Sequence, residues 1–280
     1  MLVDFMVIGA QKSGTTSLAN QLADHPSICF CKEKEPGYFH QVSDWRATID
    51  SYHSLYSPEA GQLCGEASTF YTFLPEWPDT HQRLFEYNPD LKLIYIMRHP
   101  VERVLSHYTH NLVRDLDTLP SDKAVFASPE YVNRSRYGVQ IRPYLELFER
   151  EQVLLLIFEE YVRDQVGTLS QIAEFLGIDS APFTQADTEA RHKSVGEPYL
   201  KYDSVRSFVK TPAFQRLRSA VPESIRQPIR HKLFSNTLET KPELTAETRK
   251  LLWRLLEDDV LTIEKLLDRR LDLWRQGYTD

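Results

Sequence analysis

The chain has 280 residues, of which 41% are hydrophobic and 26% are charged. These fractions are typical of a globular protein that buries roughly three quarters of its unfolded surface, and they exclude disordered and fibrous classes. The 33 basic and 40 acidic side chains give a formal net charge of −7. That sign excludes a protein that binds nucleic acid over its whole surface, so any anion site is expected to be local.

The cysteines and the N-terminus indicate the environment of the protein. Cys29, Cys31 and Cys64 are an odd count without zinc-ligand spacing, so we expect reduced thiols and no bound metal. The first ten residues, MLVDFMVIGA, contain no basic leader and no apolar run long enough to span a membrane. We therefore expect a cytoplasmic protein that does not span a membrane. The absence of repeats and linkers predicts a single domain over residues 1–280.

Short apolar runs alternate with amphipathic patterns along the first two thirds of the chain. The apolar runs are typical of strands buried on both faces of a parallel sheet. Strands are predicted over Phe5–Gly9, Ile28–Cys31, Leu93–Met97 and Val153–Phe158. Helices are predicted over Thr16–Asp24, Val101–Val113, Arg142–Glu149 and Thr168–Leu176, the last capped by Gly177. This alternation predicts an α/β fold with a central parallel β-sheet flanked by helices.

The last third of the chain has two parts. Residues 180–240 are richer in basic residues and proline, and we expect loops and short helices there. After Pro242 the leucines recur on one broad face, which predicts a long amphipathic helix close to the C-terminus.

The first predicted strand leads into a glycine-containing loop and a helix, a P-loop-like arrangement. Gly9 and Gly14 have the spacing of a Walker A loop, but Thr15 stands in the lysine position and the only lysine, Lys12, lies within the loop. Backbone N–H groups converge at such a helix start and bind phosphate or sulfate, although hydroxyls there can also simply cap the helix. The predicted anion-binding residues are Lys12, Ser13, Gly14, Thr15, Thr16 and Ser17.

A second anion site is predicted after the third of these strands. Arg98 follows this strand directly, where a magnesium nucleotidase would have an aspartate, and Pro100 opens the next helix. Ser106 lies two turns into that helix, and an arginine fork with a hydroxyl suits a phosphate monoester. Taken alone, Arg98 could be a surface ion-pair residue. Together with the first loop it predicts two separate phosphate pockets.

These motifs resemble those of the sulfotransferases that use 3′-phosphoadenosine 5′-phosphosulfate (PAPS). Gln11–Leu18 is similar to the family's loop for the 5′-phosphosulfate, and Arg98–Ser106 is similar to its 3′-phosphate motif. Lys34–Phe39 and Gly65–Tyr71 resemble elements of the heparan sulfate branch. The resemblance extends from about Phe5 to Trp274. The membrane anchor and disulfide of the animal enzymes have no counterpart here, so the chain looks like a soluble bacterial-type member.

The resemblance implies a role for two residues in the reaction. Lys12 would neutralise the charge that builds on the leaving 3′,5′-ADP, without a metal, and Glu35 would take the proton of the acceptor. Two alternatives to this role of Glu35 remain. Glu35 could belong to a solvated run of alternating charge that begins at Lys32, and His40 could be the base instead.

Further site residues are implied by the resemblance alone. Lys34, Glu66 and Tyr71 would line the acceptor pocket, although core or rim positions explain them nearly as well. Tyr137 would pack on adenine, and Arg191 or Lys193 would close over the 3′-phosphate. For these three an ordinary surface role is the alternative.

The expected function is transfer of a sulfuryl group from PAPS to a hydroxyl or amine of a carbohydrate or small metabolite. A metal-dependent nucleotide kinase is one rival, and Thr15 and Arg98 count against it. A non-catalytic protein that binds nucleotides or sulfated glycans is the other, and it would keep the anion pockets without needing Glu35. No nucleic-acid partner is expected, and the acceptor and the oligomeric state are left open.

Overall fold

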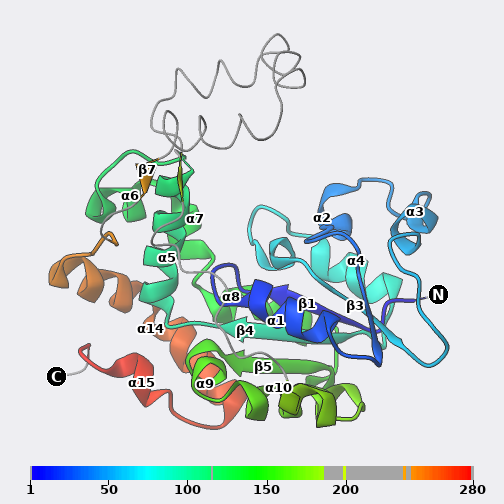
Figure 1. The fold of residues 1–280 in the computed structure, drawn as a ribbon. Helices are drawn as coiled ribbons and strands as arrows, with labels where there is room; N and C mark the ends of the chain where they lie inside the picture. Colours follow the sequence, from blue (N-terminus) through cyan, green and yellow to red (C-terminus); the bar gives the residue numbers. More distant parts are fainter. Residues whose placement is uncertain (1, 115, 186–197, 200–235, 238–240, 279–280) are drawn as a thin grey trace, which may run out of the picture.

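The computed structural model describes residues 2–114, 116–185, 198–199, 236–237 and 241–278. Five parallel strands form one sheet in the order β2-β3-β1-β4-β5, with helices on both faces (Figure 1). The α/β fold with a central parallel sheet is thereby confirmed. The strands are β1 Phe5–Gly9, β2 Ile28–Phe30, β3 Leu63–Ala67, β4 Lys92–Met97 and β5 Val153–Ile157. A separate antiparallel pair joins β6 Pro198–Tyr199 to β7 Asn236–Thr237.

The sheet divides the core into two layers, because successive side chains of a strand point to opposite faces. Phe5 and Val7 of β1 join a cluster under the helices α1 Thr15–Ala23, α9 Phe158–Arg163 and α10 Gln165–Leu176. Met6 and Ile8 join a larger cluster on the other face. The helices that contribute to this second cluster are α2 Tyr38–Gln41, α3 Ile49–His53, α4 Thr80–Tyr87, α5 Pro100–Val113, α6 Ser121–Ala127, α7 Pro129–Asn133, α8 Tyr137–Leu145, α14 Ala246–Leu267 and α15 Asp272–Arg275.

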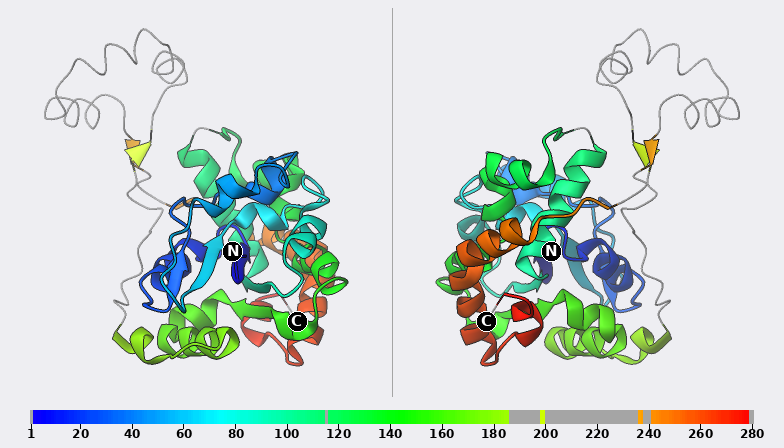
Figure 2. Two further views of the ribbon diagram at one scale, coloured as in Figure 1. Left: turned by 90° about the vertical axis from the view of Figure 1, so that its right-hand side faces the viewer. Right: turned by 90° about the vertical axis from the view of Figure 1, so that its left-hand side faces the viewer.

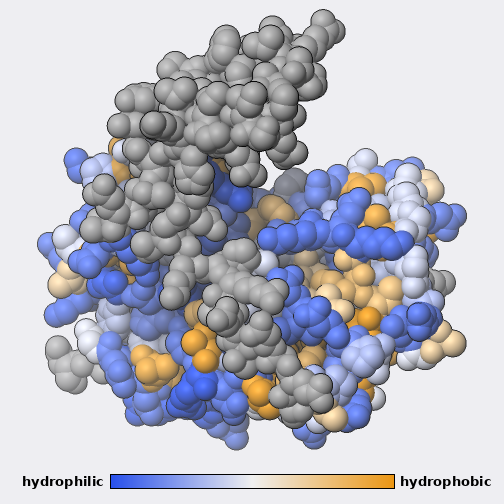
Figure 3. All heavy atoms as spheres, viewed as in Figure 1, coloured by the Kyte–Doolittle hydropathy of each residue, from blue (hydrophilic) through white to orange (hydrophobic). Residues whose placement is uncertain are grey.

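The C-terminal helices complete this second face. Helix α14 packs against α5, α7 and α8, and the turned views show it beside them in orange (Figure 2). Within the described residues, short 3₁₀ helices lie at Thr69–Thr72, Arg150–Gln152 and Ala181–Gln185. No helix in the described part of the chain is long and apolar enough to cross a membrane. Hydrophilic residues cover much of the face drawn in Figure 3.

Four of the five strands lie where the sequence predicts them, within one residue at each end. Strand β3 was not predicted from periodicity, because Gly65 and Glu66 interrupt its apolar pattern. Gly65 is needed there, since a Cβ at this position would lie 2.1 Å from the ring of Phe5 on the neighbouring strand. The strand therefore depends on a partner distant in sequence.

The predicted helices are present, but two of them begin several residues earlier than predicted: α10 begins at Gln165, three residues before the predicted Thr168. Helix α8 begins at Tyr137, five residues before the predicted start, and ends at Leu145. Helix α10 is capped by the Asp164 carboxylate at its N-terminus and by Gly177, in left-handed conformation, at its C-terminus. Helix α14 is the expected long amphipathic helix. Most of residues 180–240, with Arg191 and Lys193, lie outside the described residues.

Candidate active site

The loop between β1 and α1 lies at the carboxyl end of the sheet, where open α/β sheets bind their ligands. Lys12 and Gly14 have left-handed backbone conformations, with φ of 70° and 83°. A Cβ at Gly14 would lie 2.6 Å from the ring of Phe158, so only glycine fits this turn. No side chain in the described residues caps α1. The first-turn N–H groups of α1 therefore remain available to an anion.

Lys12 points toward helix α5. Its Nζ donates to Nδ1 of His110 over 3.2 Å. Burial, together with the positive charges of Lys12, Arg114 and Lys34, lowers the pKa of His110 to about 4. His110 is therefore neutral at physiological pH and can accept this hydrogen bond, which holds the ammonium group at the loop.

Glu35 lies in the segment before α2 and also has a left-handed backbone, with φ of 52°. Its side chain is half-buried. Burial raises the pKa of Glu35, and the charges of Lys34, Lys12 and Arg114 act against this rise. Lys12 and Glu35 are therefore within electrostatic reach of each other, although they belong to different segments. A carboxylate whose pKa is raised by burial is a stronger base than an exposed one, so Glu35 is suited to accept a proton.

His40, the alternative base, has a different environment. It is buried, and its ring stacks on Phe70 at 4.9 Å between centroids and meets the edge of Trp77 at the same distance. Burial lowers the pKa of His40 to about 4. A histidine in this aromatic packing is a weak base, so the geometry favours Glu35 over His40.

Arg98 follows β4, which pairs directly with β1. Its guanidinium lies over the ring of Phe158, 5.3 Å from the centroid. The same ring leaves no room for a Cβ at Gly14, so Phe158 packs beside both Arg98 and the first loop. Ser106 is almost buried on α5, the helix that begins directly after Arg98 and His99. The structure thus brings the loop and the start of α5 to neighbouring strand ends.

Tyr137 is not positioned as the resemblance implied. Its side chain is completely buried, and its hydroxyl donates to the carbonyl of Arg98 over 2.7 Å. Its ring packs against Tyr95 and Trp274. Because no face of the ring is open, the expected contact with adenine is wrong for this structure, and Tyr137 supports Arg98 from within the core.

Glu66 and Tyr71 are also core residues and do not line an open pocket. The hydroxyls of Tyr71 and Tyr52 donate to Glu66 Oε1 over 2.7 and 3.0 Å, and Ser68 Oγ donates to Oε2 over 3.1 Å. Ser68 Oγ in turn accepts from Gly37 N–H over 3.0 Å, which ties this cluster to the segment of Glu35. The expectation that Glu66 and Tyr71 contact the acceptor is therefore wrong. The exposed Lys34 remains a predicted acceptor contact.

Glu66 is expected to make the stability of the protein fall with rising pH. Burial raises its pKa to about 7, although the three hydroxyl donors lower it. Between the usual carboxyl pKa and this value, the unfolded state binds fewer protons than the folded state, so the free energy of unfolding decreases by roughly 3 kcal/mol. In the Glu66→Gln variant, the free energy of unfolding should not show this decrease with rising pH. Urea unfolding of both proteins at about pH 5 and pH 7 tests it, and parallel pH profiles would contradict it.

A comparison with protein families identifies the family of this chain. The family model described as the sulfotransferase domain matches residues 2–250. The chain belongs to this sulfotransferase family. It is 42% identical over 112 residues to the membrane-associated sulfotransferase kil1 of Dictyostelium discoideum, covering 38% of this chain and 22% of that protein. It is 29% identical over 188 residues to heparan sulfate glucosamine 3-O-sulfotransferase 3B1 of Mus musculus, covering 62% and 45%. The chain thus spans less than half the length of both relatives.

Solved sulfotransferase structures share the fold. A sulfotransferase from Alicyclobacillus acidocaldarius superimposes with a TM-score of 0.69 and 24% identity, covering 99% of this chain and all of that one. The mouse sulfotransferase SULT7A1, complexed with PAP, gives a TM-score of 0.53 and 15% identity, covering 98% and 88%. At these identities the likeness shows a common fold.

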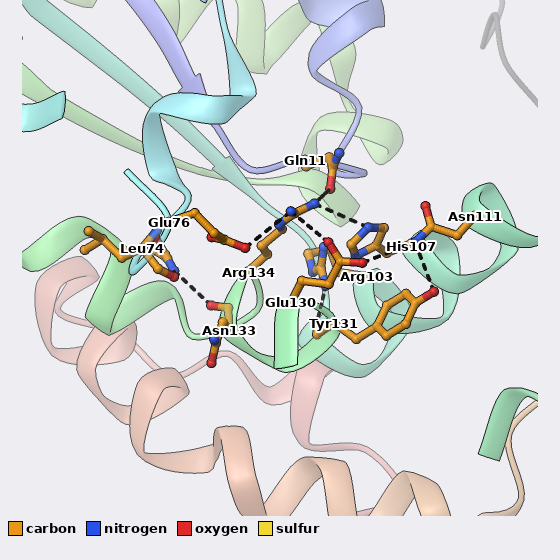
Figure 4. Close-up of polar contacts among 11 residues, drawn as sticks. Gln11, Leu74, Glu76, Arg103, His107, Asn111, Glu130, Tyr131, Asn133 and Arg134 are labelled. Atoms are coloured by element: carbon orange, nitrogen blue, oxygen red, sulfur yellow. Dashed lines mark hydrogen bonds and ion pairs between the residues drawn. The ribbon is translucent and has the colours of Figure 1, made fainter. Parts of the chain in front are cut away.

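An arginine that the sequence patterns do not indicate lies beside the first loop. Arg134 donates to Gln11 Oε1 of the first loop over 3.0 Å and pairs with Glu130 over 2.8 Å (Figure 4). Its guanidinium also lies 3.8 Å from the centroid of the Phe73 ring. Its nearness to the loop arises from the packing of α7, so no local pattern indicates it. His107 lies beside it, and burial and nearby arginines lower the pKa of this histidine. Arg134 also pairs with Glu76 over 3.4 Å, so two carboxylates offset its charge, and its hydrogen bond to Gln11 ties the end of α7 to the first loop.

Proposed function

We propose that this sulfotransferase domain transfers the sulfuryl group of PAPS to an acceptor hydroxyl or amine and releases 3′,5′-ADP. One observation carries the proposal: Lys12 lies in a left-handed, phosphate-binding type of loop, within electrostatic reach of the half-buried Glu35. A cation for the leaving group and a base for the nucleophile are the two groups that this reaction needs.

The residues of two neighbouring strand ends would hold the cofactor. The first-turn N–H groups of α1 and the hydroxyls of Thr15, Thr16 and Ser17 suit the 5′-phosphate. Arg98 and Ser106 suit the 3′-phosphate, since a guanidinium and a hydroxyl match its oxygens. Bound PAPS supplies the sulfuryl group and a stable leaving group.

In the proposed step, the acceptor oxygen or nitrogen forms a bond to sulfur while the bond from sulfur to the 5′-phosphate oxygen breaks. Lys12 neutralises the negative charge that develops on that phosphate oxygen, and His110 keeps the ammonium in position through the 3.2 Å hydrogen bond. Glu35 accepts the proton of the acceptor, and the raised pKa of Glu35 lets it hold this proton until release.

The proposed acceptor is a carbohydrate or a small molecule. The match to a heparan sulfate glucosamine 3-O-sulfotransferase supports a sugar hydroxyl. The exposed Lys34 and Arg114 lie close enough to Glu35 for their positive charges to lower its pKa. They would therefore flank an acceptor bound there. We propose no nucleic-acid partner, given the net charge of −7.

Nucleotide binding tests the proposed function against the kinase alternative. Calorimetric titration with 3′,5′-ADP in EDTA should give saturable binding, whereas ATP with magnesium should bind far more weakly. The reverse order would favour a kinase. Incubation with radiolabelled PAPS and a panel of sugars and small alcohols then separates an enzyme from a binding protein, because only an enzyme labels an acceptor.

Arg98→Ala is expected to abolish the preference for 3′,5′-ADP over 5′-AMP. The variant loses the charged, bidentate partner of the additional phosphate, so this preference should fall by roughly 10- to 100-fold. Affinity for 5′-AMP should change little, since its phosphate binds at the first loop. Competition binding measures both values, with Arg98→Lys as the matched control that keeps the charge but loses the fork. An unchanged preference in Arg98→Ala would mean that the 3′-phosphate binds elsewhere.

A further inference from the structure

The peptide group between Arg98 and His99 is hydrogen-bonded at both ends by side chains from other elements. Its carbonyl, that of Arg98, accepts from the hydroxyl of Tyr137 over 2.7 Å. Its N–H, that of His99, donates to Glu159 Oε1 over 2.8 Å. A peptide plane held on both sides cannot rotate freely, so these two bonds fix the direction in which the Arg98 side chain leaves the backbone.

Both partners of this peptide group contact a single residue of the C-terminal segment. Glu159 Oε2 accepts from the indole Nε1–H of Trp274 over 3.0 Å. The ring of Trp274 lies 6.0 Å from that of Tyr137 and 6.4 Å from that of His99. Trp274 is completely buried, so its ring cannot move without disturbing this packing.

The start of α9, directly after β5, supports Arg98 a second time. Phe158 and Glu159 are consecutive, and the guanidinium of Arg98 lies over the Phe158 ring while its backbone is held through Glu159. The guanidinium and the backbone of Arg98 are therefore held by two consecutive residues, Phe158 and Glu159. A carboxylate bonded to only one donor could rotate, whereas the Trp274 N–H and the His99 N–H together fix both oxygens of Glu159.

We propose that Trp274 and Glu159 are positioning residues for Arg98 and thereby set the selectivity of the protein for nucleotides with a 3′-phosphate. This inference rests on the proposed function, in which Arg98 binds that phosphate. Bidentate recognition requires the guanidinium fork and the phosphate oxygens to be aligned within a few tenths of an ångström. The C-terminal helix α15, remote from the cofactor loops in sequence, would thus act on cofactor recognition.

The test replaces one hydrogen-bond donor and measures nucleotide selectivity. Trp274→Phe keeps an aromatic ring but removes the N–H that orients Glu159. We expect the preference for 3′,5′-ADP over 5′-AMP to fall roughly tenfold, with the affinity for 5′-AMP unchanged. Glu159→Gln, which can no longer accept from both donors, should give the same loss and serves if the first variant does not fold.

Trp253→Phe is the matched control. Trp253 is also buried, with 3% of its surface exposed, and its ring lies 5.9 Å from that of His99, but it reaches this histidine by ring packing and not through Glu159. Its replacement should leave the preference unchanged. If all three variants lost the preference equally, the proposal would be overturned in favour of a general packing role. The same conclusion would follow if the affinity for both nucleotides fell alike. Full preference in both Trp274→Phe and Glu159→Gln would also overturn the proposal. A wild-type protein without any preference would instead contradict the proposed function.

Discussion

Lys12→Ala is expected to lower the rate of sulfuryl transfer by about 10²–10³-fold while the protein stays folded, because a fixed cation at developing charge is worth ~3–4 kcal/mol. The side chain is fixed by a left-handed backbone and by the hydrogen bond to His110, so its charge needs no reorganisation during the reaction. Single-turnover transfer from radiolabelled PAPS measures the rate, and circular dichroism checks the fold.

Lys12→Met is the matched variant, since it keeps the length of the side chain and removes only the charge. The rate of sulfuryl transfer should fall by a similar factor in both variants. His110→Ala should have a smaller effect, because it removes the group that orients Lys12 and leaves the ammonium. Turnover near the wild-type value in a folded Lys12→Met protein would refute the role of Lys12 as the neutralising cation.

Glu35→Gln is expected to lower kcat by about 10²-fold or more with little change in cofactor affinity. The variant keeps the size of the side chain but cannot accept a proton. In the wild type, activity should fall as the pH decreases through the pKa of Glu35, which burial raises, because the protonated acid is no base. This acidic limb should disappear from the pH–rate profile of the variant.

His40→Asn is the comparison that decides between the two candidate bases. The aromatic packing and lowered pKa of His40 predict that His40→Asn retains most of the activity. If His40→Asn is inactive and Glu35→Gln is active, His40 is the base. If both variants are active, the base comes from another segment, and residues 180–240 are the first to search.

Structural features that depend on consecutive residues could be predicted well from the sequence. The loop with Lys12 and Gly14 follows a strand and opens a helix within ten consecutive residues, so this arrangement is readable from spacing and residue type. The same holds for Arg98 before the helix that Pro100 begins. Both expectations concern the ends of adjacent parallel strands, which the α/β pattern brings together.

Features set by tertiary packing could not be predicted in the same way. Tyr137 and Glu66 are polar residues that look accessible in the sequence, yet both are completely buried by partners from distant segments. Arg134 and His110 reach the first loop from α7's end and from α5, and no local pattern encodes either contact. Burial and cross-element hydrogen bonds depend on which faces meet, and a single sequence does not specify this.

A crystal structure of the protein with 3′,5′-ADP tests the central claim most directly. We expect the 5′-phosphate on the N–H groups of residues 14–17, with the 3′-phosphate within hydrogen-bond distance of Arg98 and Ser106. We also expect open space between Lys12 and Glu35 for the sulfuryl group and the acceptor. A nucleotide whose 3′-phosphate faces solvent, or whose 5′-phosphate lies away from this loop, would contradict this claim.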